Sequence, residues 1–441
     1  MTQLHRAGPL FTDLYELTMA AGYFAHRVFD TATFSLYIRD VFSTRKFFVA
    51  AGLEQVLNEL AGFRFSGDEI DYLKTTGRFT TDFLSFLKHL RFNGDVHAMP
   101  EGTIFFANEP ILEVTAPIIE AQLLETFLLN TIGFQTMIAS KAARCIHAAA
   151  GRPLIDFSLR RTQGQDAGLN VARSTFIVGF TATSNVLAGK IYGIPISGTM
   201  AHSYVGAFDS ERDAFLAYFE TFPDHCIFLI DTYDTIEGAK NAAAVAMEMK
   251  EKGHMLIGVR LDSGDTVSLS REVRKILDDA GLHDVKIFAS SGFDEFKIAR
   301  VVSEGAMIDA FGVGTKVGVS ADAPFVDVVY KMVHFKDRDI RKLSPGKATL
   351  AGEKQVFRRC DTNGYFIEDI IGARNERIMG GNTLLEKVME KGKRLHPHPS
   401  LEEIRGRFNQ NFSSLDEKYK SIHDSAVYPV KLSSRLKKLQ E

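Results

Sequence analysis

From Pro153 onward, short apolar segments alternate with longer segments whose apolar residues recur with helical periodicity. The apolar segments predict strands at 154–157, 194–196, 227–230, 255–259, 285–289 and 308–311. The intervening segments predict helices at 170–190, 211–221, 235–252, 266–280 and 295–304. Strands that are connected through helices run parallel and are covered on both faces. The sequence therefore predicts an α/β fold built on a parallel sheet.

Closure of this sheet would give an irregular TIM-like α/β barrel. Residues 326–333 supply one further candidate strand, which brings the set to about seven, close to the regular barrel. An open, doubly wound sheet is the alternative, and it is disfavoured because no Gly-x-Gly-x-x-Gly turn follows the first strand. We expect the barrel, with functional side chains at the carboxyl ends of its strands.

The rest of the chain predicts two further parts around this barrel at 151–335. Residues 1–150 predict an α/β domain with helices at 12–24, 47–61 and 68–90, a strand at 31–41, a small β unit at 94–114 and a linking helix at 118–149. Residues 336–441 are charged and irregular, with one strand at 355–359 and surface helices and a tail beyond 387. A chain of 441 residues is longer than a single core requires, which agrees with several domains.

Composition excludes several classes of protein. A hydrophobic fraction of 45% and a charged fraction of 24% are typical of a globular enzyme. The net charge of −3 argues against a nucleic-acid or membrane-surface partner, and no apolar run reaches the roughly 20 residues of a membrane span. Neither a secretory signal nor a Cys-x-x-Cys pair is present, and Cys145, Cys226 and Cys360 are far apart. We expect buried thiols and a cytoplasmic location.

Small and charged residues follow almost every candidate strand. These clusters are Ser158 to Arg161, Ser197 to His202, Asp231 to Asp234, Arg260 to Asp265, Ser290 to Asp294 and Gly312 to Lys316. A single cluster of this kind is an ordinary helix cap. Several at the same end of one sheet predict a shared site, because the loops of a barrel converge there.

The chemistry of these loops favours a phosphorylated substrate. Glycine-rich loops at helix starts offer unhindered backbone N–H groups to anions. The candidates are Ser290, Ser291 and Gly292 in one loop and Gly312, Gly314 and Thr315 in another. Arg160, Arg161 and Arg260 add cations that grip phosphate, so we expect more than one phosphate group.

Acidic residues and one histidine complete the candidate site. Asp231, Asp262 and Asp265 could bind sugar hydroxyls or a Mg²⁺ ion bridged to phosphates, whereas helix capping is the alternative for each. No metal-ligand spacing is present, so we expect no metal held by the protein alone. His202, beside Gly198 and Thr199, could accept a phosphoryl group, and its alternative is a place in a capping loop.

The chain resembles the nicotinate phosphoribosyltransferases of the type II phosphoribosyltransferase class. The matching segments are Thr12 to Met19, Arg160 to Gly164, Gly198 to Ser203, Arg260 to Asp265, Phe311 to Thr315, Pro345 to Lys347, Lys354 to Arg358 and Tyr428 to Val430. They follow the family order along nearly the whole chain. The resemblance implies an α/β sandwich domain at 1–150 packed on the irregular barrel, with 336–441 packing on both.

The resemblance also implies a reaction and residue roles. Nicotinate, phosphoribosyl pyrophosphate, ATP and water would give nicotinate mononucleotide, pyrophosphate, ADP and phosphate, with Mg²⁺ as cofactor. His202 would be the phosphorylated histidine, with Arg260 and Asp231 as further catalytic residues. The expected substrate-binding residues are Tyr15, Asp13, Thr199, Arg160, Arg161, Asp262, Asp265, Ser290, Ser291, Gly292, Gly312, Gly314 and Thr315. The family further implies a homodimer with a shared active site, in which Tyr15 stacks on the pyridine ring.

Other functions were weighed against this one. A nicotinamide-specific relative places an aspartate near the position of Thr183, Ser184 and Asn185, where this chain has no acid. A quinolinate-specific enzyme is shorter and needs a denser cationic pocket for two carboxylates. A barrel that only binds phosphorylated metabolites has no use for a phosphorylatable His202. A purely structural protein does not explain the clustered anion-binding loops.

Overall fold

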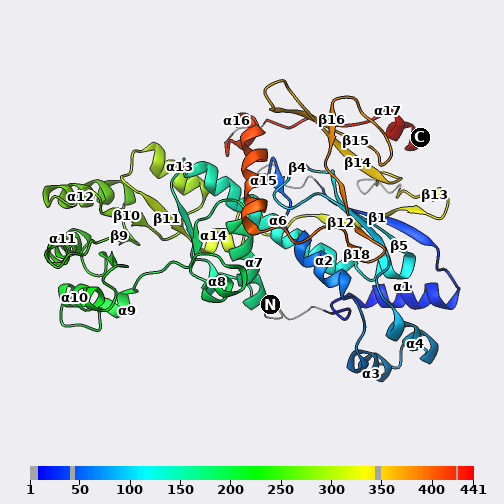
Figure 1. The fold of residues 1–441 in the computed structure, drawn as a ribbon, viewed down its shortest axis with the longest axis horizontal. Helices are drawn as coiled ribbons and strands as arrows, with labels where there is room; N and C mark the ends of the chain where they lie inside the picture. Colours follow the sequence, from blue (N-terminus) through cyan, green and yellow to red (C-terminus); the bar gives the residue numbers. More distant parts are fainter. Residues whose placement is uncertain (1–7, 40–44, 343–348, 424–425) are drawn as a thin grey trace. The chain divides into compact units, whose positions relative to one another are not determined.

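The computed structural model describes residues 8–39, 45–342, 349–423 and 426–441 (Figure 1). The chain divides into two compact units, Met1–Ser140 with Ala323–Glu441 (the two-segment unit) and Lys141–Asp322 (the central unit). The division at 150 and 335 stays a prediction about domains. Pro345, Gly346 and Lys347 lie outside the described residues.

The central unit is built on a six-stranded parallel sheet in the order β7-β6-β11-β10-β9-β8. Its strands are β6 (Leu154–Asp156), β7 (Ala182–Thr183), β8 (Ile227–Leu229), β9 (Gly258–Leu261), β10 (Lys286–Ala289) and β11 (Ala310–Val313). Within the described residues, no pairing joins the edge strands β7 and β8. The sheet is therefore a parallel half-barrel rather than the closed barrel that we expected.

Two predicted barrel strands are corrected by this topology. Residues 194–196 contribute only an isolated bridge between Ile196 and Thr183. Residues 326–333 belong to β12 (Val328–Phe335), which pairs antiparallel with β1 (Thr31–Ile38) in the two-segment unit. Tyr330 of β12 stacks on Phe34 of β1 with ring centroids 4.8 Å apart. An apolar run predicts burial in a strand, but it does not identify the sheet that the strand joins.

Helices alternate with these strands and cover the sheet (Figure 1). They are η1 (Leu159–Arg161), α7 (Gln165–Phe176), α8 (Val186–Tyr192), α9 (His202–Val205), α10 (Glu211–Thr221), α11 (Thr235–Glu251), α12 (Thr266–Asp279), α13 (Glu295–Ser303) and α14 (Thr315–Gly318). Ser210, Asp234 and Asp294 cap α10, α11 and α13 by accepting backbone N–H groups. The single helix predicted at 170–190 is wrong, because the left-handed Gly179 (φ 117°) ends this stretch and β7 follows.

The two-segment unit contains a seven-stranded antiparallel sheet in the order β13-β12-β1-β5-β3-β17-β18. Besides β1 and β12, it comprises β3 (Asp95–Ala98), β5 (Pro110–Pro117), β13 (Arg338–Asp339), β17 (Glu386–Glu390) and β18 (Lys393–Arg394). A second sheet, β16-β14-β15-β19, comprises β14 (Lys354–Cys360), β15 (Phe366–Ala373), β16 (Gly381–Thr383) and β19 (Val430–Leu432). The segment beyond 387, expected as surface helices and a tail, thus also supplies strands to both sheets.

Helices and one small ribbon complete the two-segment unit. The helices are α1 (Leu14–Ala25), α2 (Leu53–Ala61), α3 (Gly67–Thr75), α4 (Thr81–His89), α5 (Ile118–Gln122), α6 (Glu125–Ala148), α15 (Leu401–Ser414), α16 (Glu417–Lys420) and α17 (Ser434–Leu439). The ribbon pairs β2 (Phe48–Val49) with β4 (Ile104–Phe105). The linking helix predicted at 118–149 is therefore broken into α5 and α6, of which α6 continues into the central unit.

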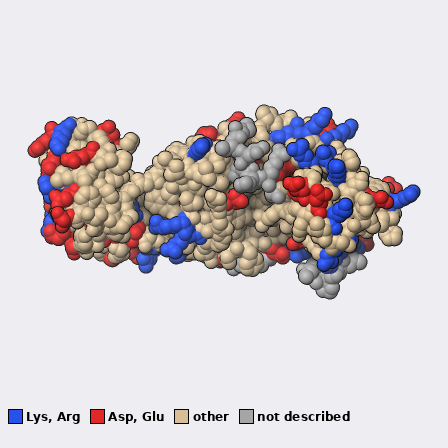
Figure 2. Space-filling model, turned by 90° about the horizontal axis from the view of Figure 1, so that it is seen from below, with Lys and Arg blue, Asp and Glu red and all other residues tan. Residues whose placement is uncertain are grey.

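Charge on the surface is mixed in sign. On the face that Figure 2 shows, lysine and arginine side chains gather beside aspartate and glutamate side chains. Among the described helices, none combines the length and apolarity that a bilayer crossing needs.

Candidate active site

Arg260, near the end of β9, is the centre of the predicted site in the central unit. Its side chain is 14% exposed. Nε donates to Thr199 Oγ1 at 3.1 Å, and one terminal nitrogen donates to Ser290 Oγ at 3.0 Å and Asp262 Oδ1 at 3.3 Å. The other terminal nitrogen donates to the Met200 carbonyl at 2.8 Å. One guanidinium thereby joins the loop before α9, the loop after β9 and the loop after β10.

One of the five N–H groups of Arg260 remains available. Nε makes one of the four hydrogen bonds above, Nη1 makes two and Nη2 makes only one, so at least one N–H of Nη2 has no recorded acceptor among the described residues. Burial lowers the pKa of Arg260, whereas Asp262 and Asp231 act in the opposite direction and Arg160 reinforces the lowering. An arginine remains protonated under these conditions. The site therefore offers a fixed cation with one free donor.

Asp231 lies just beyond β8, and one of its carboxylate oxygens holds the loop after β9 in place. Oδ2 accepts from the backbone N–H of Asp262 at 3.0 Å and from Ser263 Oγ at 2.6 Å. Oδ1 is buried and has no hydrogen-bond partner within the described residues. A buried carboxylate oxygen without a partner is unfavourable unless a ligand completes it.

His202 is the first residue of α9, and its side chain is 48% exposed. Nδ1 lies 3.1 Å from Thr232 Oγ1, and Nε2 lies 3.9 Å from Asp262 Oδ2. Sequence reasoning placed Thr232 in a polar cluster but gave it no role. The contact with Thr232 orients the imidazole ring, and the contact with Asp262 connects His202 to the hydrogen-bonded side chains around Arg260, which we call the Arg260 group.

The loop after β10 has the backbone of an anion-binding turn. Ser291 (φ 83°) and Gly292 (φ 65°) are consecutive residues with positive φ, and such a turn is one kind of backbone at which N–H groups can bind an anion. Ser290 Oγ hydrogen-bonds Asp262. Lys297 Nζ donates to the Ser291 carbonyl at 2.9 Å, and burial lowers the pKa of Lys297. The sequence analysis missed Lys297, because a lysine in the first turn of a helix carries no distinctive signal.

Gly312 and Gly314 have a packing role that the motif alone did not reveal. A Cβ atom at Gly312 would lie 2.5 Å from the ring of Phe157, and one at Gly314 would lie 2.9 Å from the Phe157 carbonyl. Thr315 is exposed and begins α14. The glycines therefore allow the β11 loop to approach the β6 loop.

Arg160 and Arg161 are exposed on η1, directly after β6. The sequence analysis missed the neighbouring Asp156, whose carboxylate is buried. Asp156 accepts from the backbone N–H of Ser158 at 2.9 Å and from Thr183 Oγ1 at 2.8 Å. Burial raises the pKa of Asp156, and both oxygens are occupied, so it fixes the loop rather than facing a ligand.

Asp265 acts as a helix cap. Its carboxylate accepts from the backbone N–H of Val267 at 3.3 Å and from Ser268 Oγ at 2.6 Å. The hydrogen bond from Ser268 is the main reason that the pKa of Asp265 is lowered. Asn185 caps α8 in the same way, through the backbone N–H of Ala188 at 3.0 Å.

Asp13 and Tyr15 lie in the two-segment unit, at the start of α1. Asp13 accepts from Thr126 Oγ1 at 3.0 Å. Tyr15 is 44% exposed. Partial burial and the nearby carboxylates of Glu125 and Glu16 raise the pKa of Tyr15, which therefore stays a neutral phenol.

The structure thus brings Thr199, Asp231, Arg260, Asp262 and Ser290 into one hydrogen-bonded group, with His202 beside it. The remaining predicted residues of the central unit lie in or near the carboxyl ends of its strands, but no hydrogen bond from them to this group is recorded among the described residues. Across the part of the chain that the structure describes, no three His, Cys, Asp or Glu side chains form a metal-binding set.

Three family models match the chain in order along its length. The N-terminal domain of nicotinate phosphoribosyltransferase matches residues 10–133, the nicotinate phosphoribosyltransferase family model matches 153–336, and the C-terminal domain matches 381–440.

Curated relatives and solved structures agree with these models. A nicotinate phosphoribosyltransferase of Mycobacterium tuberculosis is 45% identical over 97% of this chain and 92% of its own length, and that of Bacillus subtilis is 39% identical over 96% and 92%. A crystal structure of human nicotinic acid phosphoribosyltransferase superposes with a TM-score of 0.87 at 30% identity, covering 97% of this chain and 99% of the human chain. A nicotinate-nucleotide pyrophosphorylase from Pyrococcus furiosus gives 0.77 at 26% identity, covering 94% and 99%.

Proposed function

The chain belongs to the nicotinate phosphoribosyltransferase family, and we propose that it transfers the phosphoribosyl group of phosphoribosyl pyrophosphate to nicotinate, coupled to ATP hydrolysis. The Arg260 group is the observation that carries this proposal. Its free N–H would donate to the carboxylate of nicotinate, which requires a fixed cation nearby. Thr199, bonded to Arg260 Nε, would lie beside the same carboxylate.

The phosphate-bearing substrate would be held by the loops after β6, β10 and β11. The left-handed turn at Ser291 and Gly292 supplies backbone N–H groups, and Thr315 supplies a hydroxyl at the start of α14. Arg160 and Arg161 are exposed cations for the pyrophosphate leaving group.

The residues of the site fit a Mg²⁺ ion that is shared with phosphate oxygens. Asp231 Oδ1 is the buried carboxylate oxygen without a partner, whereas Asp265 is used as a helix cap and Asp262 Oδ1 is already bonded. When bound, Mg²⁺ would neutralise charge that develops on pyrophosphate. We assign it to Asp231 together with substrate phosphates.

The transfer itself requires alignment more than proton transfer. The bond from the ribose anomeric carbon to pyrophosphate breaks, and a bond to the pyridine nitrogen forms, with an oxocarbenium-like state between them. The ring nitrogen of nicotinate attacks through its lone pair and has no proton to lose. Arg260 fixes the carboxylate and hence the ring, so the protein contributes orientation and electrostatic stabilisation.

ATP would react at His202. In the tautomer that carries the proton on Nδ1, that N–H would donate to Thr232 Oγ1 and the lone pair on Nε2 would attack the γ-phosphorus. The N–P bond forms as the bond to ADP breaks, and water later releases phosphate. A phosphate on His202 would add negative charge beside the Arg260 group. This charge would reorder the loops that hold the substrate.

Two finer features of assembly belong to the same proposal. We infer a homodimer in which Tyr15 and Asp13 of one protomer contribute to the other protomer's site, because Tyr15 is exposed and neutral on α1. We also infer that the half-barrel represents an irregular member of the α/β-barrel class, and that the rest of the chain forms an α/β sandwich domain with a C-terminal segment added to it.

The substrate assignment is tested by steady-state assays with nicotinate and nicotinamide at saturating phosphoribosyl pyrophosphate and ATP. We expect a kcat/KM for nicotinate at least a hundredfold higher, because the free Arg260 N–H pairs with a charged carboxylate more strongly than with an amide. Equal or better turnover of nicotinamide would overturn the assignment.

The role of His202 is tested by incubation with γ-labelled ATP. We expect one acid-labile phosphate per chain, lost in His202→Ala and reduced in Thr232→Val, which keeps the shape but removes the hydroxyl. A His202→Ala variant that keeps the label would contradict the assignment. Absence of any label and of any turnover would instead support a barrel that only binds phosphorylated metabolites.

A further inference from the structure

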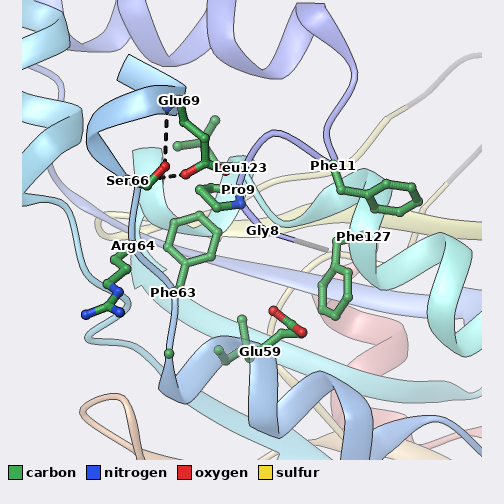
Figure 3. A pocket seen from close by; sticks show the side chains of 12 residues that line it. Gly8, Pro9, Phe11, Glu59, Phe63, Arg64, Ser66, Glu69, Leu123 and Phe127 are labelled. Atoms are coloured by element: carbon green, nitrogen blue, oxygen red, sulfur yellow. Dashed lines mark hydrogen bonds between the residues drawn. The ribbon is translucent and has the colours of Figure 1, made fainter. Parts of the chain in front are cut away.

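The two-segment unit contains two cavities that the proposed function does not use. One, of about 250 Å³, is lined mainly by rings and aliphatic groups, among them Phe11, Phe63 and Phe127 (Figure 3). Part of its polar lining is already engaged, because Ser66 and Glu69 form a capping box at the start of α3. The second cavity, of about 560 Å³, has a different character. It lies among β12, β13, β15 and α17 and is lined by charged side chains.

We propose that this second cavity binds a small phosphorylated ligand that also carries hydroxyl groups, such as a sugar phosphate. Its volume lies within the ~300–1,000 Å³ that is typical of small-molecule sites. Arg374, Arg435 and Lys438 face it with three positive charges, against the two carboxylates of Asp339 and Glu353.

Within the described residues, neither carboxylate has a recorded ion pair with the cations of α17, and each is bonded to another side chain. Asp339 accepts from His334 Nδ1 at 2.7 Å. Glu353 Oε1 accepts from Thr33 Oγ1 at 2.8 Å and from Arg374 at 3.2 Å. For the side chains of Arg435 and Lys438, the structure records no hydrogen bond or ion pair within the described residues. The outer wall of the cavity is therefore positive.

Arg374 forms the inner wall and is incompletely satisfied. Its two terminal nitrogens bond Glu113 and Glu353, but Nε is buried and has no partner within the described residues. A buried N–H without an acceptor is costly, and an anion or a hydroxyl oxygen in the cavity would complete it.

The cations of α17 are held in position before any ligand arrives. Ser433 caps the helix and donates to Glu376 at 2.7 Å, and Leu436 is fully buried. Gln440 exchanges hydrogen bonds with the backbone of Ala351 at 2.9 and 3.3 Å. Arg435 and Lys438 are three residues apart and so share one face of this fixed turn.

A glycine makes the approach of α17 possible. Gly352 has φ 83°, and a Cβ atom there would lie 2.5 Å from Leu439 Cδ2. The left-handed backbone lets the loop before β14 contact α17 closely and brings Glu353 and Lys438 to the same cavity.

The proposal is tested by calorimetric titration of the full-length protein with ribose 5-phosphate, inorganic phosphate and ribose. The test variant is Arg435→Ala/Lys438→Ala, and the matched control is Lys437→Ala, an exposed lysine of the same helix that does not line the cavity. We expect the double variant to weaken one ribose 5-phosphate binding event at least tenfold. The control should match the wild type, and ribose should bind weakest.

Two further measurements separate this cavity from the proposed active site. Crystals soaked with ribose 5-phosphate should show phosphate density between Arg435 and Lys438, and kcat/KM for nicotinate should stay within twofold of wild type in the double variant. Equal binding by the double variant and Lys437→Ala, or density only in the central unit, would overturn the proposal. Equal affinity for ribose 5-phosphate and inorganic phosphate would overturn its hydroxyl part.

Discussion

At the scale of single residues, a side chain can bind a ligand only through polar atoms that are not already hydrogen-bonded within the protein. Arg260 joins three loops through four hydrogen bonds, and among the described residues its Nη2 still has an N–H without a recorded acceptor. Asp265 uses its carboxylate as a helix cap. The sequence could not separate these cases, because both residues belong to the same Arg-Leu-Asp-Ser-Gly-Asp segment.

Replacement of Arg260 should affect nicotinate much more than ATP. We expect Arg260→Ala to lower kcat/KM for nicotinate by about 100-fold or more, roughly 3 kcal/mol, because a charged hydrogen bond is lost and its partners stay buried. Steady-state kinetics and the rate of His202 phosphorylation measure the two effects. Comparable losses for nicotinate and ATP would count against the assigned role. Arg260→Lys keeps the positive charge but lacks the planar guanidinium. Its kcat/KM for nicotinate should lie between those of the wild type and Arg260→Ala.

His97 in β3 should make the protein less stable in mild acid. Burial, followed by the positive charge of Arg374, lowers its pKa from 6.5 to about 4, so the folded state resists protonation that the unfolded state accepts. Stability is lost as the pH falls from 6.5 toward 4, by about 2 kcal/mol at pH 5 relative to pH 7. Urea unfolding at both pH values measures this loss. In His97→Gln, the decrease in unfolding free energy between pH 7 and pH 5 should be about 2 kcal/mol smaller than in the wild type. An equal decrease in both proteins would refute this explanation.

At the scale of elements, apolar periodicity was sufficient to predict several helices of the central unit, whereas the helix expected at 47–61 begins only at Leu53, after β2. The prediction of a helix at 211–221 is confirmed by α10, and the predictions at 235–252 and 266–280 agree with α11 and α12 to within one residue. The prediction at 170–190 failed because a two-residue strand, β7, is too short to interrupt an apolar pattern.

Adding one methyl group at Gly238 in α11 should destabilise the folded protein. A Cβ atom at Gly238 would lie 2.0 Å from the backbone oxygen of Ile230, which cannot move without disturbing β8. We expect Gly238→Ala to destabilise the protein by more than about 2 kcal/mol. Gly406 in α15 has no atom within 4 Å of its Cβ position, so Gly406→Ala should be neutral or stabilising, by up to about 1 kcal/mol. Denaturant unfolding compares the two, and equal effects would contradict the packing argument.

At the scale of the whole molecule, the proposed dimer predicts complementation between inactive variants. Tyr15→Ala and Arg260→Ala should each lose turnover, but a refolded mixture should regain about one quarter of wild-type activity, because half of the dimers carry one intact site. Activity of the mixture equal to the mean of the parents would show that each protomer works alone.

The sequence by itself determined the family and the alternation of parallel strands with helices in the central unit, and it predicted candidate side chains at the ends of those strands. These depend on local patterns, such as caps and strand ends, that are written in consecutive residues. Only the tertiary structure decided that β12 joins β1, that the sheet is a half-barrel, and that β17, β18 and β19 complete distant sheets. Strand partners such as β1 with β12 and β3 with β17 depend on contacts between residues hundreds of positions apart, which a local pattern does not encode. The same holds for the cavity of Arg374, Arg435 and Lys438, whose walls come from separate elements and meet only after folding.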